Sequence, residues 1–178
     1  METLVKKTVD GFEWLLDVSD GGIGRVLYAA NTIGAGISFA REKLFMNTLV
    51  DVIKPGMTCI DLGANIGYAT MFMLRESGPS GQVYAIEPDG HNMKFLMANL
   101  DLNGYIKSPN LEITQCVISH RDGTSPFWIA SQPNLNSVKK TKHSIREETI
   151  TCSTLKTFCS TRKYPNFIKM DIEGHEVS

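Results

Sequence analysis

The chain has 178 residues, 42% of them hydrophobic and 21% charged, which is the composition of an average globular protein and excludes a disordered or fibrous chain. Its 18 Lys and Arg side chains nearly balance 19 Asp and Glu side chains, so bulk charge predicts no surface for nucleic acid. No apolar run reaches the ~18 residues of a membrane span, and the N-terminus lacks a signal-peptide core. We therefore expect a soluble, cytoplasmic protein that contacts no membrane and whose four cysteines are buried free thiols.

Residues 1–56 are predicted to form a β-hairpin and a helix packed on the core. Apolar and polar residues alternate over 12–18, which predicts a half-buried strand, and the glycines at 21 and 22 supply a turn before a possible returning strand over 24–29. Apolar residues then recur at helical spacing over 45–53, and Pro55 and Gly56 follow them. This predicts an amphipathic helix that ends at Lys54.

Residues 57–178 show a more regular pattern and are predicted to form the second, functional domain. Buried strands are predicted over 57–62, 82–86, 111–118 and 166–172, with helices over 66–74 and 93–100 between the first three of them. Strands that alternate with helices at this spacing predict a Rossmann-like, doubly wound α/β fold with a mainly parallel sheet. A β insertion at about 124–153 interrupts the alternation, with two antiparallel strands near 127–129 and 149–152.

The segment Asp61-Leu62-Gly63-Ala64-Asn65-Ile66-Gly67 follows a predicted strand and opens a predicted helix. Doubly wound folds bind nucleotide-type ligands at this point, where glycines allow a tight turn and a close approach of the backbone. Glu87 stands at the end of the next predicted strand, where a carboxylate can accept hydrogen bonds from the two hydroxyls of a ribose.

The spacing of the glycines bears on which nucleotide binds. The turn lacks both the G-x-G-x-x-G pattern that holds a pyrophosphate and the P-loop pattern that cradles phosphates. Asp61 would repel a phosphate but suits a cation, and S-adenosylmethionine carries a sulfonium and an ammonium with no phosphate. The pattern therefore favours S-adenosylmethionine over NAD or ATP, and the alternative is a turn whose glycines serve packing only.

Four segments together resemble the FkbM-like family of class I, S-adenosylmethionine-dependent methyltransferases. They are C-I-D-L-G-A-N-I-G-Y (59–68), A-I-E-P-D (85–89), N-L-D-L-N-G (99–104) and F-I-K-M-D-I-E-G-H-E (167–176). The resemblance runs from about residue 40 to the C-terminus. It implies a central strand order of 3-2-1-4 and methyl transfer to an oxygen, commonly a hydroxyl of a glycan or small molecule.

The same resemblance implies where the cofactor lies. The methionine portion would lie against the turn residues Asp61, Gly63, Ala64, Asn65 and Gly67. The ribose would be held by Glu87, with Pro88 shaping the turn beside it, and adenine would lie near Ile118 and Ser119.

The chain departs from the family at two places. Lys156 stands where the family usually has an acid, and the chain ends soon after its fourth parallel strand, whereas the family fold continues. We therefore expect a C-terminally truncated domain whose uncovered sheet edge favours self-association.

Methyl transfer to a hydroxyl usually needs a group that removes the proton. Asp171 and Glu173 leave the end of the fourth strand toward the expected cofactor, so either could be this base; alternatively, Asp171 could bind Mg²⁺. Lys169 is predicted to pair with Asp171 or Glu87. Three functions stay open: an O-methyltransferase, a non-catalytic module that binds cofactor or partner, and an NAD-linked oxidoreductase.

Overall fold

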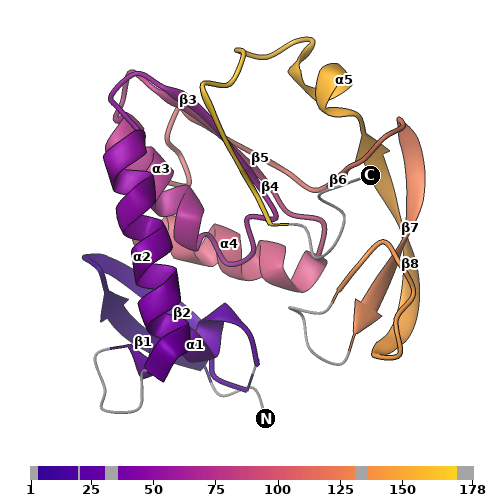
Figure 1. Ribbon diagram of the computed structural model, residues 1–178, viewed down its shortest axis with the longest axis horizontal. Coiled ribbons are helices and arrows are strands. Elements are labelled where there is room, and N and C mark those ends of the chain that lie inside the picture. The colour runs from indigo at the N-terminus through magenta and orange to yellow at the C-terminus, as the bar shows by residue number, and fades with distance from the viewer. Residues whose placement is uncertain (1–3, 20, 31–35, 131–135, 172–178) are drawn as a thin grey trace.

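A computed structural model describes residues 4–19, 21–30, 36–130 and 136–171 of the chain (Figure 1). Its centre is a four-stranded, fully parallel sheet in the order β5-β4-β3-β9. The strands are β3 (Thr58–Leu62), β4 (Gln82–Ile86), β5 (Leu111–Thr114) and β9 (Phe167–Met170). The order is third, second, first and fourth along the chain, which confirms the predicted Rossmann-like α/β fold and its central order 3-2-1-4.

The strands β3 and β4 are buried because both faces of the sheet are covered. On one face, Cys59, Val83 and Ala85 join the main core. That core also contains residues of three helices, α2 (Gly36–Val52), α3 (Tyr68–Ser77) and α4 (Gly90–Leu102). On the other face, Ile60 and Tyr84 pack with a short helix, α5 (Leu155–Cys159). A strand that is buried on both sides has a nearly continuous apolar run in its sequence, and this run allowed β3 and β4 to be predicted.

The N-terminal hairpin exists, but its partner strand differs from the predicted one. Strand β2 (Phe12–Asp17) pairs in antiparallel register with β1 (Leu4–Val9), which precedes it. The tight turn between them is formed by Asp10 and Gly11, both of which have a positive φ. The predicted returning strand over 24–29 is instead a helix, α1 (Ile23–Ala29). Its sequence lacks strict alternation, and a Cβ on Gly24 would lie 2.8 Å from the Asp17 carbonyl oxygen.

The third predicted strand, 111–118, is also corrected by the structure. The chain leaves the parallel sheet after Thr114, and β6 (Val117–Ile118) pairs with a different strand, β8 (Ser144–Ser153). Strand β7 (Gly123–Ala130) pairs with β8 in antiparallel register, which confirms the predicted β insertion. Figure 1 shows the β7–β8 hairpin on the side of the molecule opposite α2.

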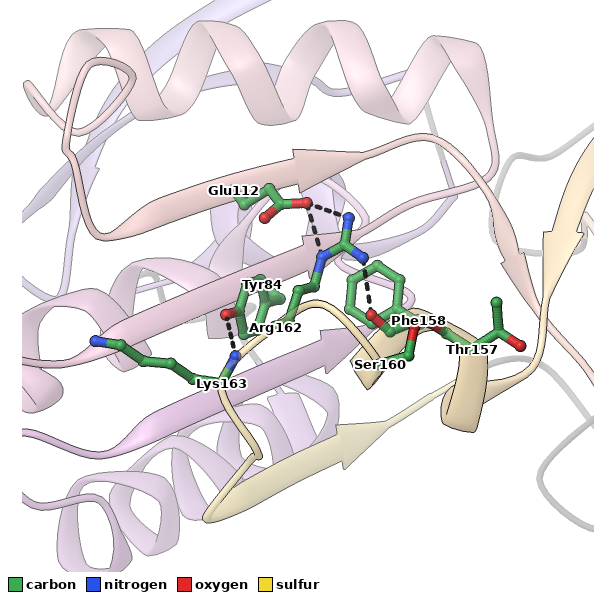
Figure 2. Close-up of polar contacts among 7 residues, drawn as sticks. All are labelled: Tyr84, Glu112, Thr157, Phe158, Ser160, Arg162 and Lys163. Carbon is green, nitrogen blue, oxygen red and sulfur yellow. Dashed lines mark hydrogen bonds and ion pairs between the residues drawn. The ribbon is translucent and has the colours of Figure 1, made fainter.

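The segment between α5 and β9 is fixed to the sheet by a cluster of polar and aromatic contacts (Figure 2). The Arg162 guanidinium donates to Glu112 Oε1 on β5, from Nε at 2.9 Å and also from Nη2, and its Nη1 donates to the Phe158 carbonyl oxygen at 2.8 Å. The same guanidinium lies 4.0 Å from the centre of the Phe158 ring. The backbone N–H of Lys163 donates to the Tyr84 hydroxyl at 3.0 Å. These contacts hold the segment that connects α5, on the outer face of the sheet, to β9.

All four cysteines are free and buried, as predicted, and burial raises the pKa of the Cys59 and Cys116 thiols to about 11. Among the described residues, no helix combines the length and the apolar character that a membrane crossing requires.

Candidate functional site

The glycine turn connects the end of β3 to the start of α3, at the carboxyl edge of the parallel sheet. Gly63, Asn65 and Gly67 all have a positive φ, so the chain reverses within a few residues. A side chain at Gly67 would be strained by its φ of 98°, and its Cβ would lie 2.8 Å from Leu96 Cδ1, which would then have to move. The backbone N–H groups of Gly63 and Ala64 donate to the carbonyl oxygen of Ile86, at the end of β4. The turn is thereby held against the next strand.

Glu87 follows β4 directly and is hydrogen-bonded to the turn. Its Oε2 accepts the backbone N–H of Asn65 at 2.7 Å, and its Oε1 accepts the backbone N–H of Asp89 at 2.9 Å. The residue is only 4% exposed. Burial raises the pKa of Glu87 to about 7, although the two backbone hydrogen bonds oppose the rise. The turn and the acid after the second strand therefore form one connected unit.

Asp61 is completely buried behind the turn. Its Oδ2 accepts the Thr70 hydroxyl at 2.6 Å, and its Oδ1 lies 3.0 Å from Lys169 Nζ, which forms an ion pair with it. The Lys169 ammonium also donates to the Gly63 carbonyl oxygen at 2.7 Å. The cation that faces Asp61 in the structure is thus a lysine of the neighbouring strand.

This arrangement corrects the prediction for Lys169, which pairs neither with Asp171 nor with Glu87. Asp61 and Lys169 are direct partners in the parallel register of β3 and β9. Side chains at one register level point to the same face of a sheet, so the two charges meet. The register follows from the assembled sheet and leaves no pattern in the sequence.

A cavity of about 680 Å³ opens beside the turn. Its lining includes Gly63, Ala64 and Asn65 from the turn, and Lys169 and Asp171 from the end of β9. The opposite wall is made by α1 and α2. The Oδ1 atom of Asn65 is buried and has no hydrogen-bond partner, so this wall of the cavity holds an unused acceptor.

Glu42 of α2 also lines the cavity, and sequence reasoning missed it. Burial raises its pKa, and the charge of Asp171 raises it further. The positive charges of Lys169 and Arg41 act in the opposite direction. Two carboxylates from distant segments thus share one cavity. A single acidic residue in an amphipathic helix carries no signal of such a position.

Three other predicted site residues, Pro88, Ile118 and Ser119, are not part of the lining of this cavity. Pro88 follows Glu87, and its carbonyl oxygen accepts the Gln115 side-chain amide at 3.1 Å. Ile118 packs on the outer core cluster, and the Ser119 backbone N–H donates to the Ser153 carbonyl oxygen at 2.9 Å. Glu173 lies outside the described residues.

The part of the chain that the structure describes contains no cluster of side chains that could form a metal site. There, no group of three or more His, Cys, Asp or Glu side chains is placed to hold a metal ion. The alternative role of Asp171 as a Mg²⁺ ligand therefore has no support from neighbouring ligands among the described residues.

A parallel sheet in this order, with a glycine turn after its central strand and an acid after the next one, defines a Rossmann-like domain of the nucleotide-binding type. Over residues 61–178 the chain matches the family model described as Methyltransferase FkbM domain, and it belongs to that family. None of the curated proteins compared with the chain matches it.

Several solved structures are similar to the chain. TYW2 of P. horikoshii in complex with MeSAdo is 22% identical, with a TM-score of 0.47, and the match covers 66% of this chain and 37% of that one. TYW2 of M. jannaschii in complex with AdoMet is 23% identical, with a TM-score of 0.46 and coverage of 65% and 44%. A SAM-dependent methyltransferase from Aquifex aeolicus is 24% identical, with a TM-score of 0.34 and coverage of 42% and 36%. The match thus spans less than half the length of each of these proteins.

Proposed function

We propose that the chain binds S-adenosylmethionine and supports methyl transfer to a hydroxyl oxygen of a small-molecule or glycan acceptor. The observation that carries the proposal is the direct hydrogen bond from the glycine turn to Glu87, at the carboxyl ends of β3 and β4. It joins the two elements that a nucleoside with an amino-acid tail requires: an acid for the ribose and an open backbone turn for the tail. Family membership supports the same activity.

The residues present fit this cofactor. The buried Oδ1 atom of Asn65 is an unused acceptor beside the turn, and the cavity lining carries both carboxylates and cationic side chains, a mixture that suits an amino-acid tail with an ammonium and a carboxylate. Ribose would be held by Glu87, beside Pro88. The tail would lie along the turn residues Gly63, Ala64, Asn65 and Gly67, with adenine toward Ile118 and Ser119. Asp61, which is buried with Lys169, would support the turn from behind.

The chemistry that the cofactor supplies when bound is an electrophilic methyl group on a sulfonium. The chain's own contribution is to orient the acceptor and to take up its hydroxyl proton, a function that typically accelerates a reaction by ~10²–10⁴-fold. Asp171 lines the cavity at the end of β9 and can accept this proton at a carboxylate oxygen. The role of Glu173 as an alternative proton acceptor and the binding of a Mg²⁺ ion by Asp171 stay predictions.

The proposal also includes a cytoplasmic location and self-association of the chain. Four buried, unpaired thiols favour the reducing cytoplasm. Strand β9 pairs only with β3 among the described strands, and the side chains of Ile168 and Met170 are 36% and 44% exposed. These features support the prediction that copies of the chain associate through this edge.

The test is a calorimetric titration of the chain with S-adenosylmethionine and, separately, with NAD. We expect binding of the first ligand only. Replacement Glu87→Gln should weaken it by about 1–3 kcal/mol, because hydrogen bonds to a charged acceptor are lost. Glu112→Gln is the matched control, since Glu112 lies on the other face of the sheet with Arg162. Binding of NAD would favour the oxidoreductase, and binding of neither ligand would overturn the proposal.

A distinction between the enzyme and a non-catalytic module needs a second assay. Release of S-adenosylhomocysteine in the presence of a panel of glycans and small alcohols would identify the enzyme. Tight cofactor binding without turnover on any acceptor would favour a binding module.

A further inference from the structure

The cavity beside the glycine turn has an apolar part to which the proposed function assigns no role. It is formed by Ile23 and Val26 of α1, Phe45 and Met46 of α2, and Phe167 of β9. Ile23, Val26 and Phe167 pack on the main core, so this wall is held in place. Phe45 is 40% exposed although its side chain is large and apolar. An apolar surface that stays open inside a cavity is typical of a ligand-binding site.

The apolar and the charged lining residues are separated in space. Glu42 and Phe45 are three residues apart on α2 and both line the cavity, so they share one face of the helix. On β9, Phe167 and Lys169 are two residues apart and share one face of the strand, and Asp171 follows. The charges of Asp171 and Lys169 both act on Glu42, so the charged ends of the two elements coincide. The cavity therefore has one charged end and one apolar end.

A methyl acceptor has to reach both ends of this cavity. The methyl group of S-adenosylmethionine is bonded to the sulfur, between the ribose and the amino-acid tail, so the acceptor hydroxyl meets it beside the turn. In the proposed function, Asp171 takes up the hydroxyl proton there. The apolar wall begins at Phe45, within about one helical turn, or ~5 Å, of Glu42. The atoms next to the reacting hydroxyl therefore extend along this wall.

We propose that the acceptor carries an aliphatic or aromatic body next to its reacting hydroxyl, and that the wall of α1 and α2 binds this body. The inference rests on the proposed function and selects one of its two acceptor classes, a small molecule with an apolar body. A glycan is disfavoured because its hydroxyls would lie against apolar side chains without hydrogen-bond partners. Both helices precede the family-matched residues 61–178, so the match does not cover this wall.

The experiment uses probes that share the hydroxyls of one sugar. Methyl β-D-glucopyranoside is the reference, hexyl β-D-glucopyranoside has a longer apolar chain, and methyl β-D-cellobioside has a second sugar. Affinities are measured by calorimetry on the chain saturated with S-adenosylhomocysteine, so that no methyl group is transferred. We expect the hexyl probe to bind at least about tenfold more tightly than the methyl probe, a gain that about two buried methylene groups supply. The second sugar should bring no comparable gain.

Variants of two adjacent residues on α2 locate the binding surface. Phe45 lines the cavity, whereas Leu44, which is 68% exposed, does not. Replacement Phe45→Ser should reduce the preference for the hexyl probe by about threefold or more, because apolar contact area is lost. Leu44→Ser is the matched control and should leave the preference unchanged. Val26→Ser tests the same wall from α1, and thermal unfolding checks that each variant is folded.

Equal affinity for the hexyl and methyl probes, or an equal loss of preference in Phe45→Ser and Leu44→Ser, would overturn the inference and leave the proposed function intact. A larger gain from the second sugar than from the hexyl chain would also overturn it and would indicate a glycan acceptor. A chain that bound the hexyl probe but neither S-adenosylmethionine nor S-adenosylhomocysteine would overturn the proposed function, and with it the assignment of this wall to a methyl acceptor.

Discussion

The two faces of the parallel sheet each carry an ion pair between neighbouring segments, and the pairs differ in burial. On the inner face, Lys169 and Asp61 lie 3.0 Å apart with side chains 10% and 0% exposed. On the outer face, the side chains of Arg162 and Glu112 are 24% and 41% exposed (Figure 2). A buried charge without its partner is far more costly than an exposed one. Loss of the inner pair should therefore destabilise both the fold and the glycine turn, because Lys169 also donates to the Gly63 carbonyl oxygen. The outer pair only holds the segment after α5 on the sheet.

Loss of the inner lysine should have the largest effect on stability. Replacement Lys169→Met leaves Asp61 completely buried without its cationic partner, so we expect the free energy of unfolding to fall by about 3–5 kcal/mol. The variant also loses the hydrogen bond to the Gly63 carbonyl oxygen, so the turn should loosen. Urea unfolding measures the stability, and hydrogen exchange at Gly63 and Ala64 reports on the turn.

The double variant Asp61→Asn/Lys169→Met is the control for charge. It removes both charges from the same place, so it should be more stable than Lys169→Met alone. If the single variant lost no more stability than a variant of the outer pair, burial would not distinguish the two faces.

Glu87 is a second buried acid of the candidate site, beside Asp61. Its pKa is raised from 4.5 to about 7 in the folded chain, mainly by burial. The folded state then holds the proton more tightly than the unfolded state. The contribution to stability is therefore complete below about pH 4.5 and is lost as the pH rises to about 7. At ~1.4 kcal/mol per pKa unit, this loss is on the order of 3 kcal/mol.

The measurement is chemical denaturation of the wild-type chain and of Glu87→Gln at pH 5 and pH 8. The wild-type chain should lose more stability between these values than the variant, because glutamine does not titrate. Equal pH dependence in both proteins would show that burial does not control the ionisation of Glu87.

The parallel sheet could be predicted because its strands are local features. Strand β4 covers the same residues that the sequence predicted, since a short apolar run ends at Glu87 and Pro88. The hairpin partner and the end of β5 could not be found in this way. A helix over Ile23–Ala29 depends on its packing against β2, and the break after Thr114 depends on the pairing of β6 with β8.

The candidate site was predictable to the same extent. The glycine turn and Glu87 stand at positions that any doubly wound fold uses, so their proximity followed from topology. The pairing of Lys169 with Asp61 depends on strand register, and the position of Glu42 beside Asp171 depends on how α2 packs over the sheet. Neither arrangement is encoded within a short stretch of residues.

The outer ion pair should show the smallest effect. Replacement Arg162→Gln removes a partly exposed pair worth up to about 1 kcal/mol and a contact with the Phe158 ring of similar size. We expect a total loss of about 1–2 kcal/mol in urea unfolding. Because exposed charges are screened, part of the difference between variant and wild type should disappear in 1 M NaCl. Affinity for S-adenosylmethionine should stay within twofold of wild type, since Arg162 holds the chain on the face away from the turn. A larger loss of affinity would mean that the position of β9, and of Asp171 at its end, depends on this outer attachment.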